Sequence, residues 1–123
     1  MPHPNFVILY VINPQASAAF YARLLGAEPV ESSPTFAMFA LDSGVMLGLW
    51  ARHTVEPAAP TSGASAELAF ALDSNAAVDA MHAVWRDGGV PIIQGLTAMD
   101  FGYTFTATDP DGHRLRVFAP GAA

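Results

Sequence analysis

The 123-residue sequence has no cysteine and no lysine, and its five arginines face eleven acidic residues. Without cysteine, disulfides, thiolate nucleophiles and cysteine-ligated zinc sites are excluded. The net charge of −6 argues against a phosphate-neutralising surface, so we expect neither nucleic acid nor a membrane as partner. The longest apolar run, Phe6 to Ile12, is shorter than the roughly 18 residues of a membrane span. The start of the chain lacks the features of a secretory signal, and we expect a cytoplasmic protein.

Length and apolar content predict a single domain. A chain of this size with 52% hydrophobic residues can bury a core without disulfides. We expect that domain to span residues 1–123 and to repeat one unit, with module one at 5–51 and module two at 66–120. The intervening residues 52–65 are rich in Pro, Ala, Thr, Ser and Gly, which is typical of a linker.

The first module is expected to begin with a strand and a helix. Phe6 to Ile12 is β-branched and aromatic, as in a buried strand. Asn13 followed by Pro14 predicts an N-cap and a first helical residue, and Gly26 lies where a left-handed residue ends a helix. Further strands are expected at 36–41 and 45–50, with room for a short one near 29–31.

The second module repeats this order. The segment from Glu67 to Leu72 predicts a strand. A helix is expected to follow, with Asp73 or Ser74 as its N-cap and Trp85 in the core. Strands are expected at 103–107 and 114–118, with a short one near 91–94. The sequence Asp109-Pro110-Asp111-Gly112 predicts the turn between the last two strands.

Two motifs carry a family resemblance. The first is Tyr10-Val11 followed by Ala19-Phe20-Tyr21-Ala22-Arg23-Leu24-Leu25-Gly26, and the second is Asp109-Pro110-Asp111-Gly112-His113. In this order and spacing the chain resembles the glyoxalase/bleomycin-resistance group, also called the vicinal oxygen chelate superfamily. The resemblance implies an α+β fold in which two βαβββ modules form a U-shaped mixed β-sheet trough with the helices outside. It also implies that the trough holds the ligand and that the protein is a homodimer.

Most enzymes of that superfamily bind a divalent metal through four side chains, usually His and Glu. Aligned by the motifs, these positions are Phe6, Gly48, Glu67 and Arg116, and the internal repeat gives the same alignment. Phe and Gly offer no donor atom, and a guanidinium repels cations. A lone carboxylate is a weak site for an ion that needs several ligands. We therefore expect no metal and no other cofactor.

Within this superfamily, the chain more closely resembles the phenazine antibiotic-resistance proteins. The matching stretches are Leu9-Tyr10-Val11, Ser65-Ala66-Glu67, Asp100 to Phe105 and Asp109 to Val117, and Trp50 falls at an equivalent position. Such proteins bind the drug without a metal. The resemblance implies metal-independent binding and sequestration of a small planar aromatic molecule, such as a phenazine-type antibiotic or another toxic metabolite.

Strand alternation sorts the side chains around these positions. If Phe6 faces the ligand, so do Ile8 and Tyr10, whereas Val7 packs under the helix. The same rule places Met46 and Trp50 on the same face of their strand as Gly48, and Phe118 on the same face as Arg116. The candidate ligand-binding residues are Phe6, Tyr10, Phe36, Met46, Gly48, Trp50, Glu67, Phe101, Tyr103, Arg116 and Phe118.

Several of these residues have an alternative structural role. Trp50 and Phe36 could be ordinary core residues, since aromatic side chains most often fill interiors. Glu67 and Arg116 could be an ion pair that joins two strands, and if the pair is buried its loss would cost about 3–5 kcal/mol.

Three functions compete at this stage. We expect a binding protein rather than an enzyme, and assign no catalytic residue. The alternative is a lyase, isomerase or dioxygenase of the same superfamily that acts on a small substrate, with Glu67 as its base. An interaction module without a ligand would instead have a filled trough.

Overall fold

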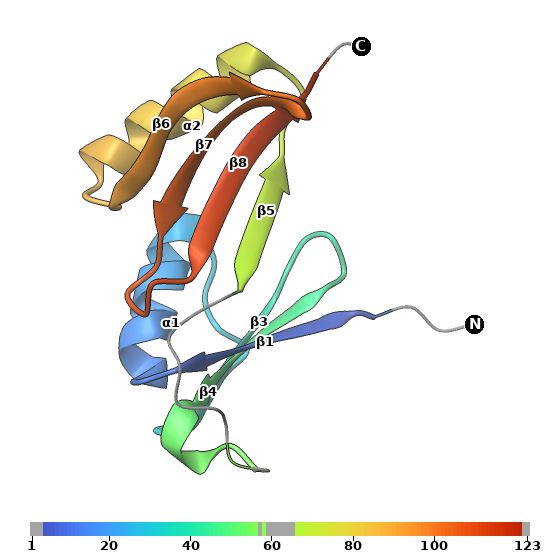
Figure 1. Cartoon of the computed structure of the whole chain (residues 1–123). Coiled ribbons are helices and arrows are strands. Elements are labelled where there is room, and N and C mark those ends of the chain that lie inside the picture. The colour runs from blue at the N-terminus through green and yellow to red at the C-terminus, as the bar shows by residue number, and fades with distance from the viewer. Residues whose placement is uncertain (1–3, 57, 59–65, 122–123) are drawn as a thin grey trace. The chain divides into compact units, whose positions relative to one another are not determined.

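The computed structural model describes residues 4–56, 58 and 66–121. The chain divides into two compact units, residues 1–63 and 64–123. Each unit is a four-stranded mixed sheet with one helix packed on one of its faces (Figure 1). The predicted α+β fold with two βαβββ modules is confirmed. The trough that the resemblance implies stays a prediction.

The first unit contains five main elements. They are β1 (Phe6–Val11), α1 (Pro14–Leu25), β2 (Glu31–Ser32), β3 (Phe36–Ala40) and β4 (Met46–Ala51). The strand order is β1-β4-β3-β2, with β1 parallel to β4 and the other pairs antiparallel. A short 3-10 helix, η1 (Arg52–Thr54), follows β4. The predicted linker therefore begins with ordered structure, while its residues 57 and 59–65 lie outside the described residues.

The ends of α1 follow from its capping residues. The Asn13 side chain accepts hydrogen bonds from the backbone N–H groups of Gln15 and Ala16, at 3.0 and 3.2 Å. Gly26 ends the helix with φ 65°, a left-handed conformation that glycine adopts without strain. Both predicted helix ends are confirmed.

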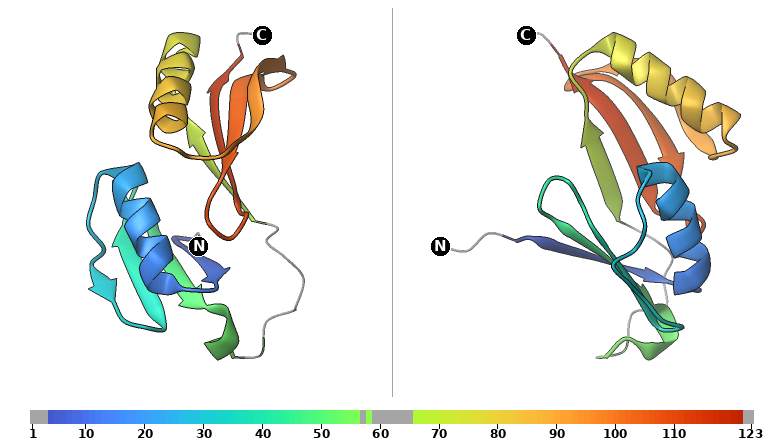
Figure 2. Two further views of the ribbon diagram at one scale, coloured as in Figure 1. Left: turned by 90° about the vertical axis from the view of Figure 1, so that its left-hand side faces the viewer. Right: turned by 180° about the vertical axis from the view of Figure 1, so that it is seen from behind.

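The second unit repeats the arrangement (Figure 2). Its elements are β5 (Glu67–Ala71), α2 (Asn75–Asp87), β6 (Ile92–Met99), β7 (Gly102–Thr108) and β8 (Arg114–Pro120). The strand order is β5-β8-β7-β6, with β5 parallel to β8 and the other pairs antiparallel. The N-cap of α2 is Ser74, whose side chain accepts from Ala77 N–H at 3.1 Å.

Strand β6 is longer than predicted. The expected short strand near 91–94 extends to Met99, with register shifts between Ile92 and Gln94 and between Gln94 and Thr97. Gly95 lowers the intrinsic strand propensity of this segment. Pairing with β7 overrides that propensity, so the strand continues.

The core of each unit lies between its sheet and its helix. Leu9 and Val11 are buried in the first unit, while Tyr10 between them is only partly buried, as strand alternation predicts. Val7 is 37% exposed, which corrects the expectation that it packs under the helix. The reason is the position of Val7 along the edge strand β1: α1 packs on β3 and β4, and the residues of this face that are buried lie farther along β1, at Leu9 and Val11.

Trp85 belongs to the core of the second unit, as predicted. It is 4% exposed and meets Phe70 and Phe105 edge-to-face, with ring centroids 5.5 Å apart in both pairs. The Asp109–Gly112 segment is the predicted turn. The Asp109 carboxylate accepts from the backbone N–H groups of Asp111 and His113, at 2.9 and 2.8 Å.

Neither α1 nor α2 is long and apolar enough to cross a membrane, and the same holds throughout the described part of the chain.

Candidate functional site

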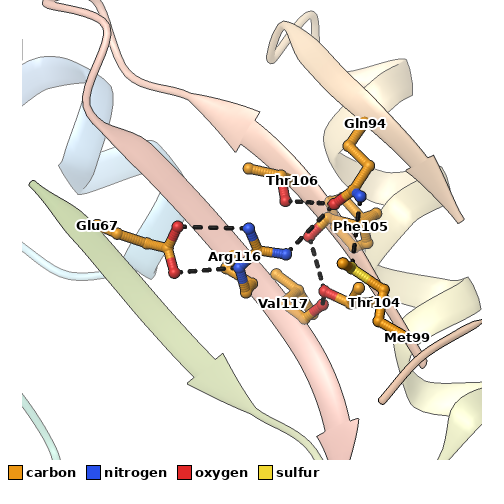
Figure 3. A network of polar contacts seen from close by, with 8 residues as sticks. All are labelled: Glu67, Gln94, Met99, Thr104, Phe105, Thr106, Arg116 and Val117. Atoms are coloured by element: carbon orange, nitrogen blue, oxygen red, sulfur yellow. Dashed lines mark hydrogen bonds and ion pairs between the residues drawn. The ribbon is translucent and has the colours of Figure 1, made fainter. Parts of the chain in front are cut away.

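An ion pair occupies the open face of the second sheet, the face opposite α2 (Figure 3). Arg116 Nε donates to Glu67 Oε2 at 3.0 Å, and Arg116 Nη2 donates to Glu67 Oε1 at 3.4 Å. Two parallel contacts of this kind fix the plane of the guanidinium. The predicted ion pair between β5 and β8 is confirmed. Its side chains are 17% and 39% exposed for Arg116 and Glu67, so the pair is not fully buried.

A second set of contacts extends the network across the sheet. Gln94 Oε1 accepts from Thr106 Oγ1 at 2.9 Å and from Arg116 Nη1 at 3.3 Å. The Gln94 amide nitrogen lies 3.5 Å from Met99 Sδ. Thr106 is buried on β7, and the network therefore joins all four strands of the sheet through polar side chains.

Aromatic rings border this network. The Arg116 guanidinium carbon lies 5.6 Å from the centroid of Phe101, within the range of a cation–π contact. Phe101 also meets Phe118 edge-to-face at 5.7 Å. Phe101 is 43% exposed, so its ring is accessible from solvent. The structure thus brings four predicted site residues together in the second unit: Glu67, Phe101, Arg116 and Phe118.

The first unit has an aromatic cluster on the open face of its sheet. A Cβ added at Gly48 would lie 3.0 Å from both Phe36 Cζ and Phe6 Cε1, so atoms of the two rings border the space that a side chain at position 48 would need. Met46 is the strand partner of Phe6 on the same face. Glycine at position 48 is thus what permits both rings to approach the sheet.

Tyr10 and Trp50 continue this open face. They are register partners on β1 and β4, and their rings meet edge-to-face with centroids 6.3 Å apart. Trp50 and Phe36 are both partly buried, in contrast to the fully buried Leu47 and Leu49 on the opposite face. These aromatic side chains therefore do not belong to the core between sheet and helix.

Tyr103 is the predicted site residue that the structure does not bring to either cluster. It lies on the helix-covered side of β7, where its hydroxyl donates to Asp79 Oδ1 of α2 at 2.6 Å. This hydrogen bond, with burial and the carboxylate charge as smaller causes, raises the pKa of Tyr103. Strand alternation accounts for the placement, because Thr104 and Thr106 of β7 are the register partners of Phe118 and Arg116.

The four superfamily metal positions come together in pairs. Phe6 lies over Gly48 in the first unit, and Glu67 binds Arg116 in the second. These groups do not fit a divalent cation, since a phenyl ring and a glycine give no donor atom and the carboxylate is already bound to a guanidinium. Within residues 4–56, 58 and 66–121 no group of three or more His, Cys, Asp or Glu side chains could hold a metal ion.

Sequence reasoning missed Gln94 and Thr106. Both lie in line with Arg116 on the open face, because Arg116 pairs with Thr106 and Thr106 with Gln94 in the sheet register. The register shifts in β6 decide this alignment, and they leave no signal in a single sequence. Polar–apolar alternation along β7 separates Thr104 and Thr106 from Tyr103 and Phe105, but only the pairing of β7 with β8 places Thr106 beside Arg116.

Comparison with known proteins agrees with this architecture. The family model described as Glyoxalase/Bleomycin resistance protein/Dioxygenase superfamily matches residues 3–117. The phenazine antibiotic resistance protein EhpR of Enterobacter agglomerans is 30% identical over 117 residues, covering 93% of this chain and 89% of that protein.

Two solved structures show the same fold. Protein ATC0852 from Agrobacterium tumefaciens, solved by NMR in solution, is 56% identical with a TM-score of 0.89, covering 99% of this chain and 100% of that one. A glyoxalase/bleomycin resistance protein/dioxygenase family enzyme from Burkholderia phytofirmans PsJN is 25% identical with a TM-score of 0.78, covering 95% and 98%. The two βαβββ units, the paired positions on their open faces and the match along almost the whole sequence lead to one conclusion: the chain belongs to the glyoxalase/bleomycin resistance protein/dioxygenase superfamily.

Proposed function

We propose that the protein binds and sequesters a small planar aromatic molecule without a metal. The observation that supports this most is the chemistry at the four superfamily metal positions. A phenyl ring packed against a glycine and a carboxylate bound to a guanidinium replace the donor atoms that a metal needs. Aromatic surface and one oriented cation are what a flat, mostly apolar ligand requires.

The relative EhpR suggests the class of ligand. That protein is a phenazine antibiotic resistance protein, and the alignment covers nearly all of both chains. A phenazine is a planar tricyclic aromatic, and phenazine-1-carboxylate adds an anionic group to the edge of that ring system. Arg116 is held by Glu67 and Gln94 in a fixed plane, which suits it to bind such a group. Phenazine-type antibiotics, or toxic metabolites of similar shape, are therefore our proposed ligands.

Each unit has aromatic ring surface on the open face of its own sheet. Trp50 and Tyr10 offer ring surface on the open face of the first sheet, and Phe101 and Phe118 do so on the second. We propose these rings as ligand-contacting residues, each pair within its own unit. Stacking of this kind contributes about 0.5–1.5 kcal/mol per ring pair beyond the area it buries.

Isothermal titration calorimetry with phenazine-1-carboxylate tests the proposal, using protein treated with EDTA and then dialysed. We expect saturable binding, with an affinity about tenfold weaker in Trp50→Leu. Trp85→Phe is the matched control, because Trp85 lies in the core, and a folded Trp85→Phe protein should retain the affinity. Binding that needs added Ni²⁺, Zn²⁺ or Mn²⁺, or turnover of the ligand, would contradict the proposal.

A second pair of variants tests the role of Phe101. Phe101→Leu removes the ring that lies against Arg116, and we expect several-fold weaker binding. Tyr103→Phe removes only a hydroxyl that faces α2, so its affinity should be unchanged. If both variants bind as tightly as the original protein, the Phe101 ring does not contact the ligand.

A further inference from the structure

The Gln94 side-chain amide has strong hydrogen-bond partners at its oxygen and a weak one at its nitrogen. Its carbonyl oxygen Oε1 accepts from Thr106 Oγ1 at 2.9 Å and from Arg116 Nη1 at 3.3 Å. A guanidinium can only donate, so the oxygen and not the nitrogen of the amide must face Arg116. The orientation of the Gln94 amide is therefore determined by its neighbours.

The amide nitrogen is consequently directed toward Met99 (Figure 3). It lies 3.5 Å from Met99 Sδ, and a thioether is a weak acceptor. Met99 is 45% exposed at the end of the edge strand β6, and its unbranched side chain moves easily. An arriving ligand can thus displace the sulfur and give the N–H group a stronger acceptor.

Gln94 lies beside Arg116, so the acceptor would belong to a ligand that Arg116 also binds. Both side chains project from the open face of one sheet, and they share a direct hydrogen bond. A ligand group bound by Arg116 therefore brings the rest of that ligand close to the Gln94 amide. A lone pair at the ring edge would be the natural partner of the N–H group, whereas a C–H edge would leave the amide without one.

We infer that Gln94 donates a hydrogen bond to an acceptor at the edge of the ligand's ring system, a ring nitrogen or a ring-borne oxygen. Gln94 thereby selects nitrogen- or oxygen-containing aromatics over hydrocarbons of the same shape. The inference rests on the proposed function, since it assumes that a planar aromatic ligand binds at this face. It adds the chemical class of that ligand and the residue that recognises it.

The test compares two neutral ligands of equal shape, phenazine-2-carboxamide and anthracene-2-carboxamide, which differ in the two ring nitrogens. We expect the protein to bind the phenazine about fivefold or more tightly than the anthracene, as for one satisfied hydrogen bond. In Gln94→Leu this ratio should fall to about one. In Gln94→Glu, an oxygen replaces the amide nitrogen while the acceptor for Thr106 and Arg116 is kept, and the ratio should also fall.

Met99→Leu is the matched control, because it removes the thioether and leaves the Gln94 amide in place. This variant should keep the preference for the phenazine. Circular dichroism melting of each variant verifies that the fold is retained. Comparing the ratio of the two ligand affinities within each variant cancels any effect of the substitution that changes both affinities equally.

The outcomes separate this inference from the function on which it rests. Equal affinity of the unmodified protein for both ligands would overturn the role of Gln94 and leave aromatic binding intact. A preference that persists in Gln94→Leu and Gln94→Glu would show that another group recognises the ring nitrogens. Binding of neither ligand would overturn the proposed function and this inference with it.

Discussion

At the scale of single residues, Gly48 decides which side chains fit on the open face of the first sheet, and the Glu67–Arg116 pair orients a cation on the open face of the second. Gly48 leaves space for two aromatic rings, and Arg116 is oriented by Glu67 and Gln94. The expectation that a buried Glu67–Arg116 pair would cost about 3–5 kcal/mol to break no longer applies, because Glu67 is 39% exposed. Because solvent screens this pair, we expect it to position the Arg116 side chain more than to stabilise the fold.

Gly48→Ala is expected to destabilise the first unit. The added methyl group would approach the Phe6 and Phe36 rings to 3.0 Å, so both rings must shift. We expect a loss of about 1–2 kcal/mol in the free energy of unfolding, measured in urea. Gly95→Ala is the control, since nothing lies within 4 Å of its added carbon, and it should be neutral or slightly stabilising. Equal losses in both variants would show that the rings do not depend on Gly48.

Glu67→Gln tests the positioning role of the ion pair. Because the pair is partly exposed, we expect the free energy of unfolding to fall by about 1 kcal/mol or less. Affinity for an aromatic carboxylate should fall several-fold, since Arg116 loses its fixed plane. Asp87→Asn disrupts the exposed Arg86–Asp87 pair on α2 and should change neither quantity. A loss of several kcal/mol in Glu67→Gln would show that the pair is mainly structural.

At the scale of elements, a polar contact joins the sheet and the helix of the second unit. The Tyr103 hydroxyl of β7 donates to Asp79 of α2 at 2.6 Å, beside the apolar packing of Trp85 and Phe105. Apolar packing accounts for most of the cohesion between sheet and helix. The hydrogen bond between Tyr103 and Asp79 makes the stability of the folded protein depend on pH.

Tyr103→Phe should remove part of the alkaline loss of stability. The pKa of Tyr103 is raised above its usual value of 10.0 by the Asp79 hydrogen bond, so the folded protein retains this proton longer than the unfolded chain. The resulting stabilisation is complete below pH 10 and is lost as the pH rises through the folded-state pKa. Melting temperatures measured from pH 8 to 11 should therefore fall less steeply in Tyr103→Phe. Identical pH profiles would mean that the contact does not form in solution.

At the scale of the whole molecule, the chain has exposed apolar residues at the start of β1. Phe6, Val7 and Ile8 are 42%, 37% and 44% exposed, although they are consecutive residues of one strand. Such exposure is unfavourable in water and is typical of surfaces that associate. This observation and the superfamily resemblance support our prediction of a homodimer, while a cytoplasmic location stays a prediction.

Light scattering coupled to size-exclusion chromatography measures the oligomeric state. We expect a mass about twice the 12.9 kDa of the chain at micromolar concentration, with dissociation on dilution if association is weak. A mass equal to that of one chain across the whole concentration range would show that the protein is a monomer.

The sequence by itself determined the order of the elements and the faces of several strands, although not that of Tyr103. Capping residues such as Asn13 and Gly26 act locally, and strand alternation separates Leu9 and Val11 from Tyr10, so each could be predicted without tertiary structure. The superfamily motifs located the four positions Phe6, Gly48, Glu67 and Arg116, and the internal repeat, which relates Phe6 to Glu67 and Gly48 to Arg116, supported that alignment; the structure brings Phe6 to Gly48 and Glu67 to Arg116. Tertiary structure alone decided the length of β6, the exposure of Val7 and the place of Gln94 beside Arg116. These features depend on which strand lies at an edge and where the ladder shifts register, and that is set by contacts between residues distant in the chain.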